Sequence, residues 1–458
     1  MLSRSTTLAA FVAVLAVVSV GPAAADTINI PSEEPTIQAG VLVASAGDTL
    51  LLAPMTYTGS GNRDIDFGGI DLVVISEAGA AATIVDCENA ARAFLFQSGE
   101  TGDATIDGLT ITRGLVVEAN GGAIYCAGSS PTIRNCIFVL NSVDAADDLF
   151  WGGGAIFCTD SSAFISGCEF QQNNAAGSFA SGGAIYVRDA SPTIADCSFA
   201  QNYCQFRAAG LHIWGASTPV IVGCDFVDNV GDAWGGAIST MDGPNPVVTN
   251  CTFTANEAGS GAGIYSAYSS PEVSDCVFTD NHATSGGGAI QASDTSSRVF
   301  TRILCVGNRA DDSGGAFGFA WNTPTVTSCT LSGNSAPNGG GVRCYGSSCT
   351  PSIQNTIIAF STEGAAMLCE NSAAPTTNHS CIYGNAGGDV LCGVIQDNIF
   401  ADPQFCEPSQ GDFQIMDNSP CSPSGNVWGE LVGAYGIGCS GPVPVTLTTW
   451  GVLKSLFL

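Results

Sequence analysis

A repeat of 26 or 27 residues fills the middle of the chain and constrains the fold more than any other feature. Residues 181–202, SGGAIYVRDASPTIADCSFAQN, show one copy. Aligned on the glycine pair, the repeats start at Gly121, Gly153, Gly182, Ala209, Gly235, Gly261, Gly287, Gly314 and Gly340. A period of this length indicates stacked supersecondary units that share one continuous core.

Two solenoid folds fit this period. The second half of the unit reads I-x-x-C-x-F-x-x-N and also fits the strand of a leucine-rich repeat. The first half, GGAIYVRDASP, lies where a leucine-rich repeat needs a returning helix, and its Gly, Pro and β-prone residues oppose one. It alternates with period two, as a half-buried strand does. We therefore predict at least two strands per unit and a parallel β-helix.

Stacked coils place equivalent residues above one another, about 4.8 Å apart. The phenylalanines of C-x-F-x-x-N predict an internal stack of rings: Phe138, Phe170, Phe199, Phe226, Phe253 and Phe278. The asparagines predict a ladder at a turn, where side-chain amides bond the next coil: Asn141, Asn173, Asn202, Asn229, Asn256, Asn281, Asn308 and Asn334. The glycine pair suits a tight corner with unusual dihedral angles.

The flanks of the repeats predict closed ends. Residues 35–45, PTIQAGVLVAS, predict a short amphipathic helix that covers the first coil, since an open end exposes core and strand edges. Residues 47–59 then start the strands, and the repeat decays after Ser361. The predicted divisions are a signal peptide (1–25), N-terminal cap and first coils (26–120), regular repeats (121–360), C-terminal coils with a Cys-containing cap (361–439), and a tail (440–458).

The N-terminus has the layout of a secretory signal peptide. Arg4 precedes an apolar run from residue 8 to residue 20, and Ala25 ends a small-residue cleavage pattern. The run is too short for an ordinary membrane span, and no later segment reads as a transmembrane helix. We expect a secreted protein, extracellular or at the outer cell surface. The tail, GPVPVTLTTWGVLKSLFL, is either a sorting or anchoring segment or a frayed terminus.

Charge limits the partners. Only 12% of residues are charged, and 41 Asp and Glu face 12 Lys and Arg. Nucleic acid is excluded as a partner, because its phosphates require a basic surface. Polyanionic sugars are disfavoured unless Ca²⁺ mediates binding, and no Ca²⁺ motif or other cofactor motif occurs in the sequence. Glycans or cell-surface components remain as partners.

Most of the 20 cysteines fit a core better than a disulfide framework. One repeat position, filled by Ile303 in one unit, carries Cys136, Cys168, Cys197, Cys224, Cys251, Cys276 and Cys329. We interpret these as buried free thiols, since neighbouring coils hold their Cβ vectors parallel. Zinc is disfavoured because there is no C-x-x-C and only three His. The late Cys392, Cys406, Cys421 and Cys439 are predicted to staple the C-terminal cap.

Three segments resemble known families. GGAI paired with F-x-x-N resembles the repeat of chlamydial-type polymorphic outer-membrane proteins, which are β-helical surface adhesins. PTIQAGVLVASAGDTLLLAPMTYTG resembles the first coils of bacterial pectin-lyase-like proteins. ADPQFCEPSQGDFQIMDNSPCSPSGN with VGAYGIG resembles the closing segment of bacterial right-handed β-helix surface proteins. The resemblance implies an all-β, right-handed parallel β-helix of the pectin-lyase-like class, and it implies no single activity.

Enzymes of this class act on polysaccharides, and polygalacturonases and pectate lyases each have characteristic sequence motifs. Polygalacturonases carry N-T-D, D-D, H-G and R-I-K, whereas this chain has only D-D, at residues 147–148 and 311–312, which we interpret as solvated turns. Pectate lyases use an Arg base with Asp-bound Ca²⁺, but no such motif surrounds the arginines, which we interpret as isolated surface residues: Arg188, Arg207, Arg298, Arg302 and Arg309. His212 lies at an outward strand position without a recurring partner. No catalytic residue is assigned.

One constellation precedes the early repeat starts. Four successive units carry an aromatic residue there, with carboxylates in the same loops, and the rings line up along one edge. The predicted ligand-binding residues are Phe150, Trp151, Phe179, Phe206, Trp234, Asp147, Asp148 and Asp232. Flat rings beside carboxylates suit stacking on sugar rings. The alternative is that these rings seal a corner of the core.

Three functions therefore stay open. The first is a non-enzymatic surface or extracellular protein that presents loops for adhesion or carbohydrate binding. The second is a polysaccharide lyase or glycoside hydrolase, which requires Asp and Arg side chains to converge in space. The third is a purely structural role in a cell envelope.

Overall fold

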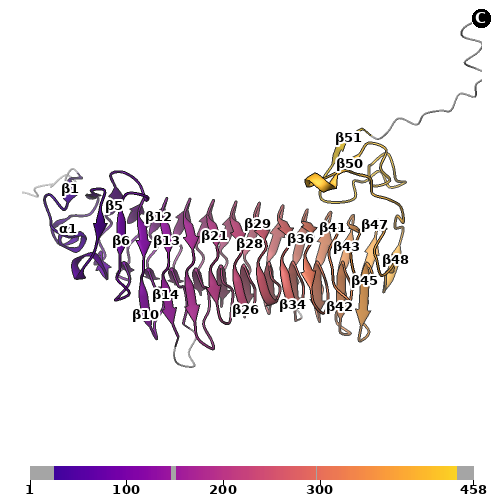
Figure 1. Ribbon diagram of the computed structural model, residues 1–458, viewed down its shortest axis with the longest axis horizontal. Coiled ribbons are helices and arrows are strands. Elements are labelled where there is room, and N and C mark those ends of the chain that lie inside the picture. Colours follow the sequence, from indigo (N-terminus) through magenta and orange to yellow (C-terminus); the bar gives the residue numbers. More distant parts are fainter. Residues whose placement is uncertain (1–24, 146–150, 295–296, 441–458) are drawn as a thin grey trace, which may run out of the picture.

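In the computed structural model, the chain winds into one elongated right-handed parallel β-helix, which confirms the predicted fold class (Figure 1). The structure describes residues 25–145, 151–294 and 297–440. Outside these ranges lie the predicted signal peptide up to residue 24, the tail from residue 441, and the predicted site residues Asp147, Asp148 and Phe150. No helix within the described ranges is long and apolar enough to cross a membrane.

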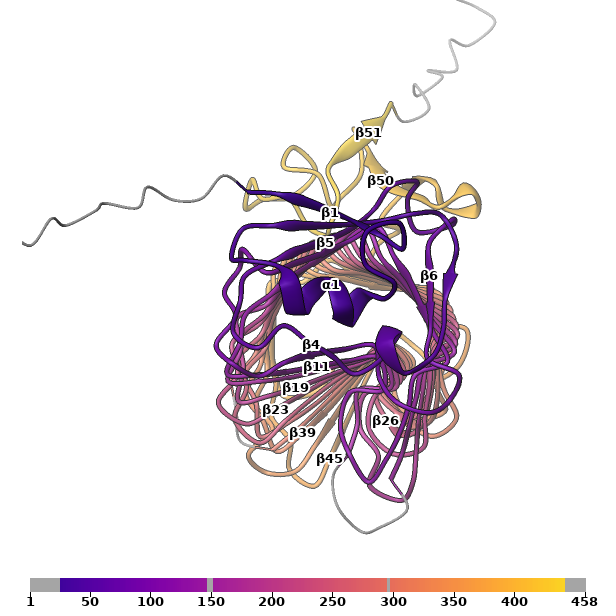
Figure 2. The same cartoon turned by 90° about the vertical axis from the view of Figure 1, so that its left-hand side faces the viewer.

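Four parallel sheets form the walls of the solenoid (Figure 2). A middle coil passes through sheets C, A, B and D in that order, two more strands than the predicted minimum. Sheet A contains β1 (Thr27–Ile30), β2 (Thr49–Leu52), β5 (Val73–Ser76), β8 (Thr105–Asp107), β12 (Thr132–Arg134), β16 (Phe164–Ser166), β20 (Thr193–Ala195), β24 (Val220–Val222), β28 (Val247–Thr249), β32 (Glu272–Ser274), β36 (Val299–Thr301), β40 (Thr325–Thr327), β43 (Ser352–Gln354), β46 (Thr376–Asn378) and β48 (Val394–Gln396).

Sheet B follows sheet A across a short turn. It contains β3 (Thr56–Tyr57), β6 (Ile84–Asp86), β9 (Thr110–Thr112), β13 (Ile137–Val139), β17 (Glu169–Gln171), β21 (Ser198–Ala200), β25 (Asp225–Val227), β29 (Thr252–Thr254), β33 (Val277–Thr279), β37 (Leu304–Val306), β41 (Thr330–Ser332), β44 (Ile357–Ala359) and β47 (Cys381–Tyr383). The turn residue has positive φ in coil after coil, as at Asp196 and Asn250, residue types that adopt this conformation at low cost.

Sheets C and D complete the coil. Sheet C contains β4 (Ile65–Asp66), β7 (Phe94–Phe96), β11 (Ile124–Ala127), β15 (Ile156–Thr159), β19 (Ile185–Arg188), β23 (Leu211–Trp214), β27 (Ile238–Met241), β31 (Ile264–Ala267), β35 (Ile290–Ser293), β39 (Phe317–Ala320), β42 (Val342–Tyr345) and β45 (Met367–Glu370). Sheet D contains β10 (Leu115–Val117), β14 (Ser142–Asp144), β18 (Asn174–Ala176), β22 (Tyr203–Cys204), β26 (Val230–Trp234), β30 (Glu257–Ser260), β34 (His282–Gly286) and β38 (Arg309–Ala310).

The glycine pair forms the corner between sheets D and C. Gly182 has a φ of 66°, and a Cβ on Gly183 would lie 2.3 Å from the carbonyl oxygen of Tyr203. The strand register corrects two predicted repeat starts by one residue, because Ala208 and Gly339 occupy the position assigned to Ala209 and Gly340. The alignment on small residues missed this shift because Ala and Gly also fill the neighbouring positions.

Both predicted ladders are confirmed. Ring centroids in the phenylalanine stack lie between 4.4 and 5.0 Å apart, and neighbouring planes differ by 8° or less. In the asparagine ladder, Nδ2 of Asn202 donates to Oδ1 of Asn229 at 2.9 Å and to the carbonyl oxygen of Phe170 at 2.9 Å. Because the ladder is buried, these bonds satisfy polar groups that water cannot reach.

The cysteine row is also confirmed as free and buried. Two disulfides lie near the C-terminus, Cys369–Cys392 and Cys406–Cys439. Of the predicted cap staples, only Cys406 and Cys439 join each other. Cys392 instead bonds the last coil at β45, and Cys421 is a buried free thiol that contacts Cys381, so the prediction for these two residues is corrected.

The predicted N-terminal helix is present as α1 (Ile37–Val43), and Figure 2 shows it across the open end of the first coil. Thr36 caps it, because its Oγ1 accepts from the backbone N–H of Ala39 at 3.2 Å. The strands start earlier than predicted, since β1 precedes the helix and pairs with β2. A short 3₁₀ turn, η1 (Ser60–Asn62), lies beside α1.

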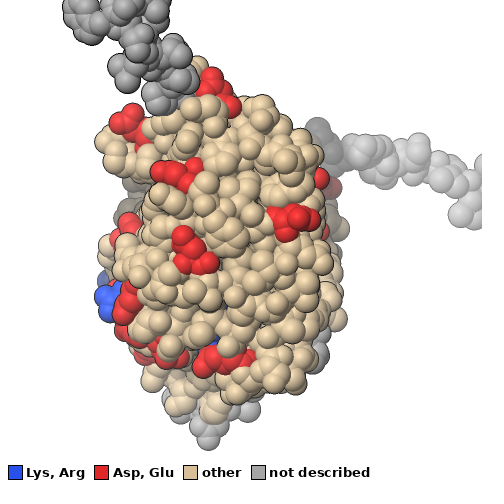
Figure 3. All heavy atoms as spheres, turned by 90° about the vertical axis from the view of Figure 1, so that its right-hand side faces the viewer, with Lys and Arg blue, Asp and Glu red and all other residues tan. Residues whose placement is uncertain are grey.

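The C-terminal segment does not lie over the last coil. Sheet E consists of β49 (Phe405–Glu407), β50 (Asp412–Met416) and β51 (Ile437–Cys439), with η2 (Pro408–Gln410) between the first two. It packs against the outer face of sheet B, where Phe405, Phe413 and Ile415 join Leu304 and Ile357 in one apolar cluster. The end of the solenoid beyond β45, β47 and β48 therefore faces the viewer in Figure 3.

Candidate functional site

The outward face of sheet C carries most of the aromatic and arginine side chains that could bind a ligand. One outward row runs Tyr125, Phe157, Tyr186, His212, Ser239, Tyr265 and Gln291, each residue in register with the next. Rings contact one another along it: Tyr125 stacks on Phe157 at a centroid distance of 5.6 Å, and Phe157 meets Tyr186 edge to face at 5.3 Å. The face is therefore a continuous surface along the axis of the solenoid.

A backbone ladder lies over part of this face. Where sheet D returns to sheet C, single parallel bridges join Gly152 to Ser181, Ser181 to Arg207, and Arg207 to Trp234. Side chains on this return segment contact one another: the Phe179 and Phe206 centroids lie 5.5 Å apart and those of Phe206 and Trp234 lie 4.9 Å apart. We call this return segment, which includes Gly152, Ser181, Arg207 and Trp234, the roof, because it covers the middle of the row.

Under the roof, three polar residues are fully buried. Tyr186, His212 and Ser239 are 0% exposed. Among the described residues, no hydrogen bond of ordinary geometry reaches the Oη of Tyr186, the ring nitrogens of His212 or the Oγ of Ser239. The Ser239 backbone lies near the imidazole and offsets only part of the effect of its burial. Burial, together with the nearby Arg207 guanidinium, lowers the pKa of His212 well below its usual value, so its imidazole is neutral. His212 is outward, as predicted, but it is closed to solvent.

Beyond Trp234 the roof residues are small and the face opens. The next bridge partners along the ladder are Ser260, Gly286 and Ser313. A hollow of about 480 Å³ lies here on the outer side of sheet C. Its lining is Trp234, Met241, Tyr265, Ala267, Tyr268, Ser293, Asp294, Trp321 and Ser348. It combines four aromatic rings with one carboxylate and two serine hydroxyls.

Two of these rings occupy a strained turn position. From β11 onward, the residue that directly follows each sheet C strand has positive φ, and Asp160, Asp189 and Gly215 fill this position in earlier coils. Tyr268 and Trp321 fill it with φ values of 50° and 55°, and their exposed fractions are 64% and 48%. Bulky residues in this region are rare and cost free energy. Gly346 gives Trp321 room, because a Cβ there would lie 2.4 Å from the indole ring.

The carboxylate of the hollow is held in place. Asp294 is 8% exposed, accepts from the backbone N–H of Tyr268, and lies 3.2 Å from Nη2 of Arg298. Arg298 also donates from Nε to Oγ of Ser266 at 2.7 Å. Arg298 is only 1% exposed, so its prediction as a surface residue was wrong. It replaces the proline that directly precedes the sheet A strand in most coils, and its charge is compensated inside the corner.

A second hollow, of about 350 Å³, lies at the other end of the same face. Tyr125, Trp151, Arg92 and Arg188 line it. Arg92 lies over the Tyr125 ring at 5.5 Å, and Arg188 lies over the Phe157 ring at 5.1 Å. These stacked guanidinium groups add positive potential to an otherwise acidic protein.

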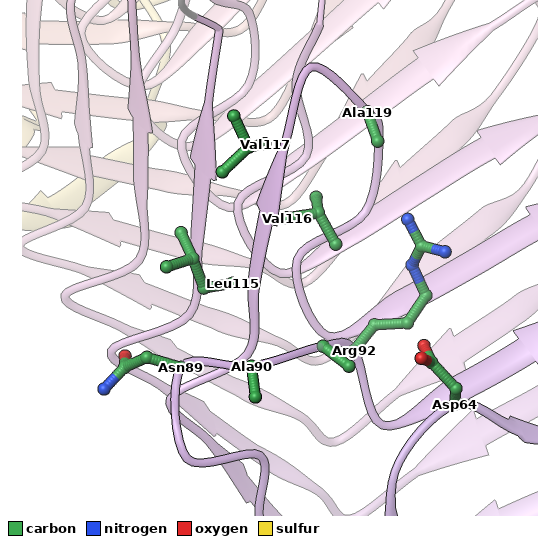
Figure 4. A pocket seen from close by; sticks show the side chains of 9 residues that line it. Asp64, Asn89, Ala90, Arg92, Leu115, Val116, Val117 and Ala119 are labelled. Carbon is green, nitrogen blue, oxygen red and sulfur yellow. The ribbon is translucent and has the colours of Figure 1, made fainter.

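Arg92 also borders a neighbouring hollow of about 340 Å³, shown in Figure 4. Leu115, Val116 and Val117 of β10 form one wall, and Asn89, Ala90, Arg92 and Asp64 lie across from them. Nε of Arg92 donates to the carbonyl oxygen of Gly121 at 3.1 Å, which fixes the guanidinium between the two hollows. No aromatic ring lines this space among the described residues, so it offers no stacking surface.

The structure separates the predicted site residues. Phe179, Phe206 and Trp234 lie together on the roof, and Trp151 lines the hollow beside Tyr125 while packing against the alanines of sheet D. Asp232 lies elsewhere, in a hollow on sheet D with Glu257 and His282, where it accepts from Oη of Tyr203 at 2.7 Å. The predicted ring line therefore exists, while its role in binding stays a prediction.

Sequence reasoning missed Tyr265, Tyr268, Asp294 and Trp321. An available signal was the presence of Tyr and Trp at a turn position that holds Asp or Gly in other coils. The Asp311–Asp312 pair does not form a carboxylate dyad, because Asp311 bonds His282 at 3.1 Å and Arg309 at 2.7 Å. No group of three or more His, Cys, Asp or Glu side chains in the described part of the chain is arranged to hold a metal ion.

Comparison with known proteins agrees with the fold. A family model described as "Right handed beta helix region" matches residues 150–302. No curated protein matches the sequence. The resemblance to chlamydial-type polymorphic outer-membrane proteins stays a prediction.

Two solved structures are similar at low identity. Pectate lyase Pel9A is 12% identical over 88% of this chain and 91% of its own, with a TM-score of 0.35. A mannuronic acid specific polysaccharide family 6 lyase from human gut microbiota is 11% identical over 82% of this chain and 83% of its own, with a TM-score of 0.32. Neither likeness implies an activity for this chain.

Proposed function

We propose that this chain is an exported β-helix protein that binds polysaccharide chains on the outward face of sheet C without cleaving them. The hollow around Trp234, Tyr265, Tyr268 and Trp321 carries the proposal. Ligand sites combine aromatic walls with a few fixed polar groups, and here Asp294 and the two serines supply acceptors and donors for sugar hydroxyls. Export is inferred from the N-terminal sequence pattern.

The spacing of the exposed rings supports a chain-like ligand. Tyr268 and Trp321 lie at the same position of coils two apart, so about 10 Å separates them along the axis. That separation is similar to the length of a disaccharide unit. The rings therefore suit every second sugar of one polymer that lies along the solenoid.

The hollow has a single carboxylate among its described lining residues, which favours binding over hydrolysis. Glycoside hydrolysis uses a pair of carboxyl groups on opposite sides of the scissile bond. Among the described lining residues only Asp294 is acidic, and its charge is engaged by Arg298. His212, the nearest histidine in the same row, is buried and neutral, which removes it as an accessible base.

A binding assay tests the proposal. Neutral and acidic polysaccharides would be screened by calorimetry, with and without Ca²⁺, alongside assays for new reducing ends and unsaturated products. Replacing Tyr268 and Trp321 together with Ala removes two stacking contacts, each worth about 0.5–1.5 kcal/mol, and should weaken binding roughly tenfold or more. Phe164→Ala, an exposed ring on sheet A, is the matched control. Unchanged affinity in the double variant, or product formation by the parent protein, would overturn the proposal.

A further inference from the structure

The last coil exposes a residue that every neighbouring coil buries. Ile395 in β48 is in register with Thr377, and through it with Ile353 and Val326 in the inward row of sheet A. Ile353 and Val326 are 1% exposed, whereas Ile395 is 49% exposed. In the other coils an inward residue is covered by the coil that follows. No coil follows β48 among the described residues, so Ile395 is exposed to solvent at a core position.

The exposed core position belongs to an apolar end surface, which we define as residues 388–400. Its large exposed residues are Val390, Ile395 and Phe400, with exposed fractions of 56%, 49% and 57%, whereas Val394 lies in the outward row of sheet A. The segment is fixed to the coil below: Val394 N–H donates to the Pro375 carbonyl at 2.8 Å, and Cys392 is bonded to Cys369. The end surface is therefore an ordered layer.

The two ends of the solenoid are treated differently. At the N-terminal end, α1 covers the first coil and buries Ile37 and Val41. At the C-terminal end, the segment that contains sheet E packs against the side of the solenoid instead. There the N–H of Gly433, between β50 and β51, donates to the Asn355 carbonyl at 2.8 Å. Figure 1 shows sheet E beside sheet B rather than beyond β48. Within the described residues, β48 pairs on one side only, with β46.

Charge is sparse on the end surface. The protein has a net charge of −29, yet residues 388–400 contain only Asp389 and Asp397 as charged groups. Asp389 is occupied, since it accepts from the backbone N–H groups of Gly384 and Asn385 at 3.0 and 2.9 Å. Figure 3 shows the carboxylates of this end standing apart on a largely uncharged face. Like-charge repulsion between two acidic molecules is smallest where such faces meet.

We propose that two copies of this chain associate end to end through residues 388–400, related by a twofold axis. Identical coil outlines place the same apolar side chains opposite one another, and the free edge of β48 meets its own copy. Stacking of the last coil on the first coil of another copy is blocked by α1. The association therefore closes as a dimer and leaves both sheet C faces open.

Sedimentation velocity of the complete chain tests this inference. The expected species has twice the chain mass. The dimerisation affinity should rise as salt is raised, because salt screens the repulsion between the two acidic molecules that opposes the apolar contact. Ile395→Asp combined with Phe400→Asp should weaken dimerisation by about 100-fold or more, since each carboxylate would be buried opposite its copy. Val299→Asp is the control, because Val299 is a similarly exposed apolar residue of sheet A, at 41%, that lies four coils before the end.

Each outcome decides the inference. Dimers of the parent and of Val299→Asp, with a monomeric double variant whose thermal unfolding midpoint is unchanged, support it. A monomeric parent overturns it. The proposal also fails if the 458-residue chain is monomeric while a chain ending at Ser440 dimerises, because the residues after Ser440 would then cover the end surface. A dimer that dissociates as salt is raised, or that persists in the double variant, also overturns it.

Discussion

The indole of Trp234 stacks on the ring of Tyr265 at a centroid distance of 5.6 Å and an interplanar angle of 16°. Trp234 comes from the roof segment and Tyr265 from the outward row of sheet C. This pair marks the boundary between the closed part of the face, over His212 and Ser239, and the open hollow beside Tyr268 and Trp321. One contact therefore supports both the fold and the candidate binding surface.

Trp234→Ala should lower both the free energy of unfolding and the affinity for polysaccharide. Loss of the stack on Tyr265 and of the contact with Phe206 should lower the free energy of unfolding by about 2 kcal/mol, because the ring is only half-buried. Polysaccharide affinity should fall about tenfold, since one wall of the hollow is removed. Trp234→Phe should recover most of both. Denaturant titration and calorimetry give the two values, and full affinity in Trp234→Ala would exclude this wall from the site.

His212→Leu should stabilise the protein by about 1–2 kcal/mol at pH 7, because it removes a buried imidazole whose nitrogens make no hydrogen bond of ordinary geometry with the described residues. The folded state keeps this imidazole neutral, whereas the unfolded chain binds a proton below about pH 6.5. The parent should therefore lose about 1.4 kcal/mol per pH unit as the pH falls below 6.5. Denaturation at pH 7 and pH 5 should show a wider gap at pH 5. A constant gap would mean that His212 titrates in the folded protein.

Buried thiols should make the protein sensitive to alkali. Burial raises the pKa of Cys204 and of Cys329 to about 12. In the unfolded chain a thiol ionises near pH 8.5, so between that value and pH 12 the unfolded state binds fewer protons and stability falls as the pH rises. Each thiol should contribute a loss of about 1.4 kcal/mol per pH unit. Cys204→Ala should reduce the slope of unfolding free energy against pH by that amount, and an unchanged slope would contradict the assignment.

Asn229→Ala should be among the most destabilising single changes. Nδ2 of Asn229 donates to the Phe199 carbonyl and to Oδ1 of Asn256, and its Oδ1 accepts from Nδ2 and N–H of Asn202. Removing the amide leaves several buried groups unpaired, at a cost of about 3 kcal/mol or more.

Asn334→Ala serves as the comparison for this change. Asn334 donates only to the Cys305 carbonyl and passes no bond to a following asparagine among the described residues. It should cost less than Asn229→Ala. Equal losses in urea titrations would show that the ladder bonds are not cooperative along the solenoid.

The repeated residues predict the solenoid without any structure, because each of them acts on its equivalent in the adjacent coil. A phenylalanine stacks on the phenylalanine one period away, and an asparagine bonds the asparagine one period away, so period and identity together specify the coil. The same logic identified the buried thiols. It also identified the ring line of Phe179, Phe206 and Trp234, since these residues precede equivalent corners.

Which outward residues contact solvent depends on the three-dimensional fold. Alternation with period two separates inward from outward positions, but it cannot show that the return from sheet D covers His212 while it leaves Tyr265 at the edge of a hollow. Nor can it show that Arg298 turns into a corner beside Asp294, or that sheet E packs on the flank and leaves Ile395 open. Those outcomes depend on the paths of the connections between sheets, which are set by packing between residues that share no repeat position.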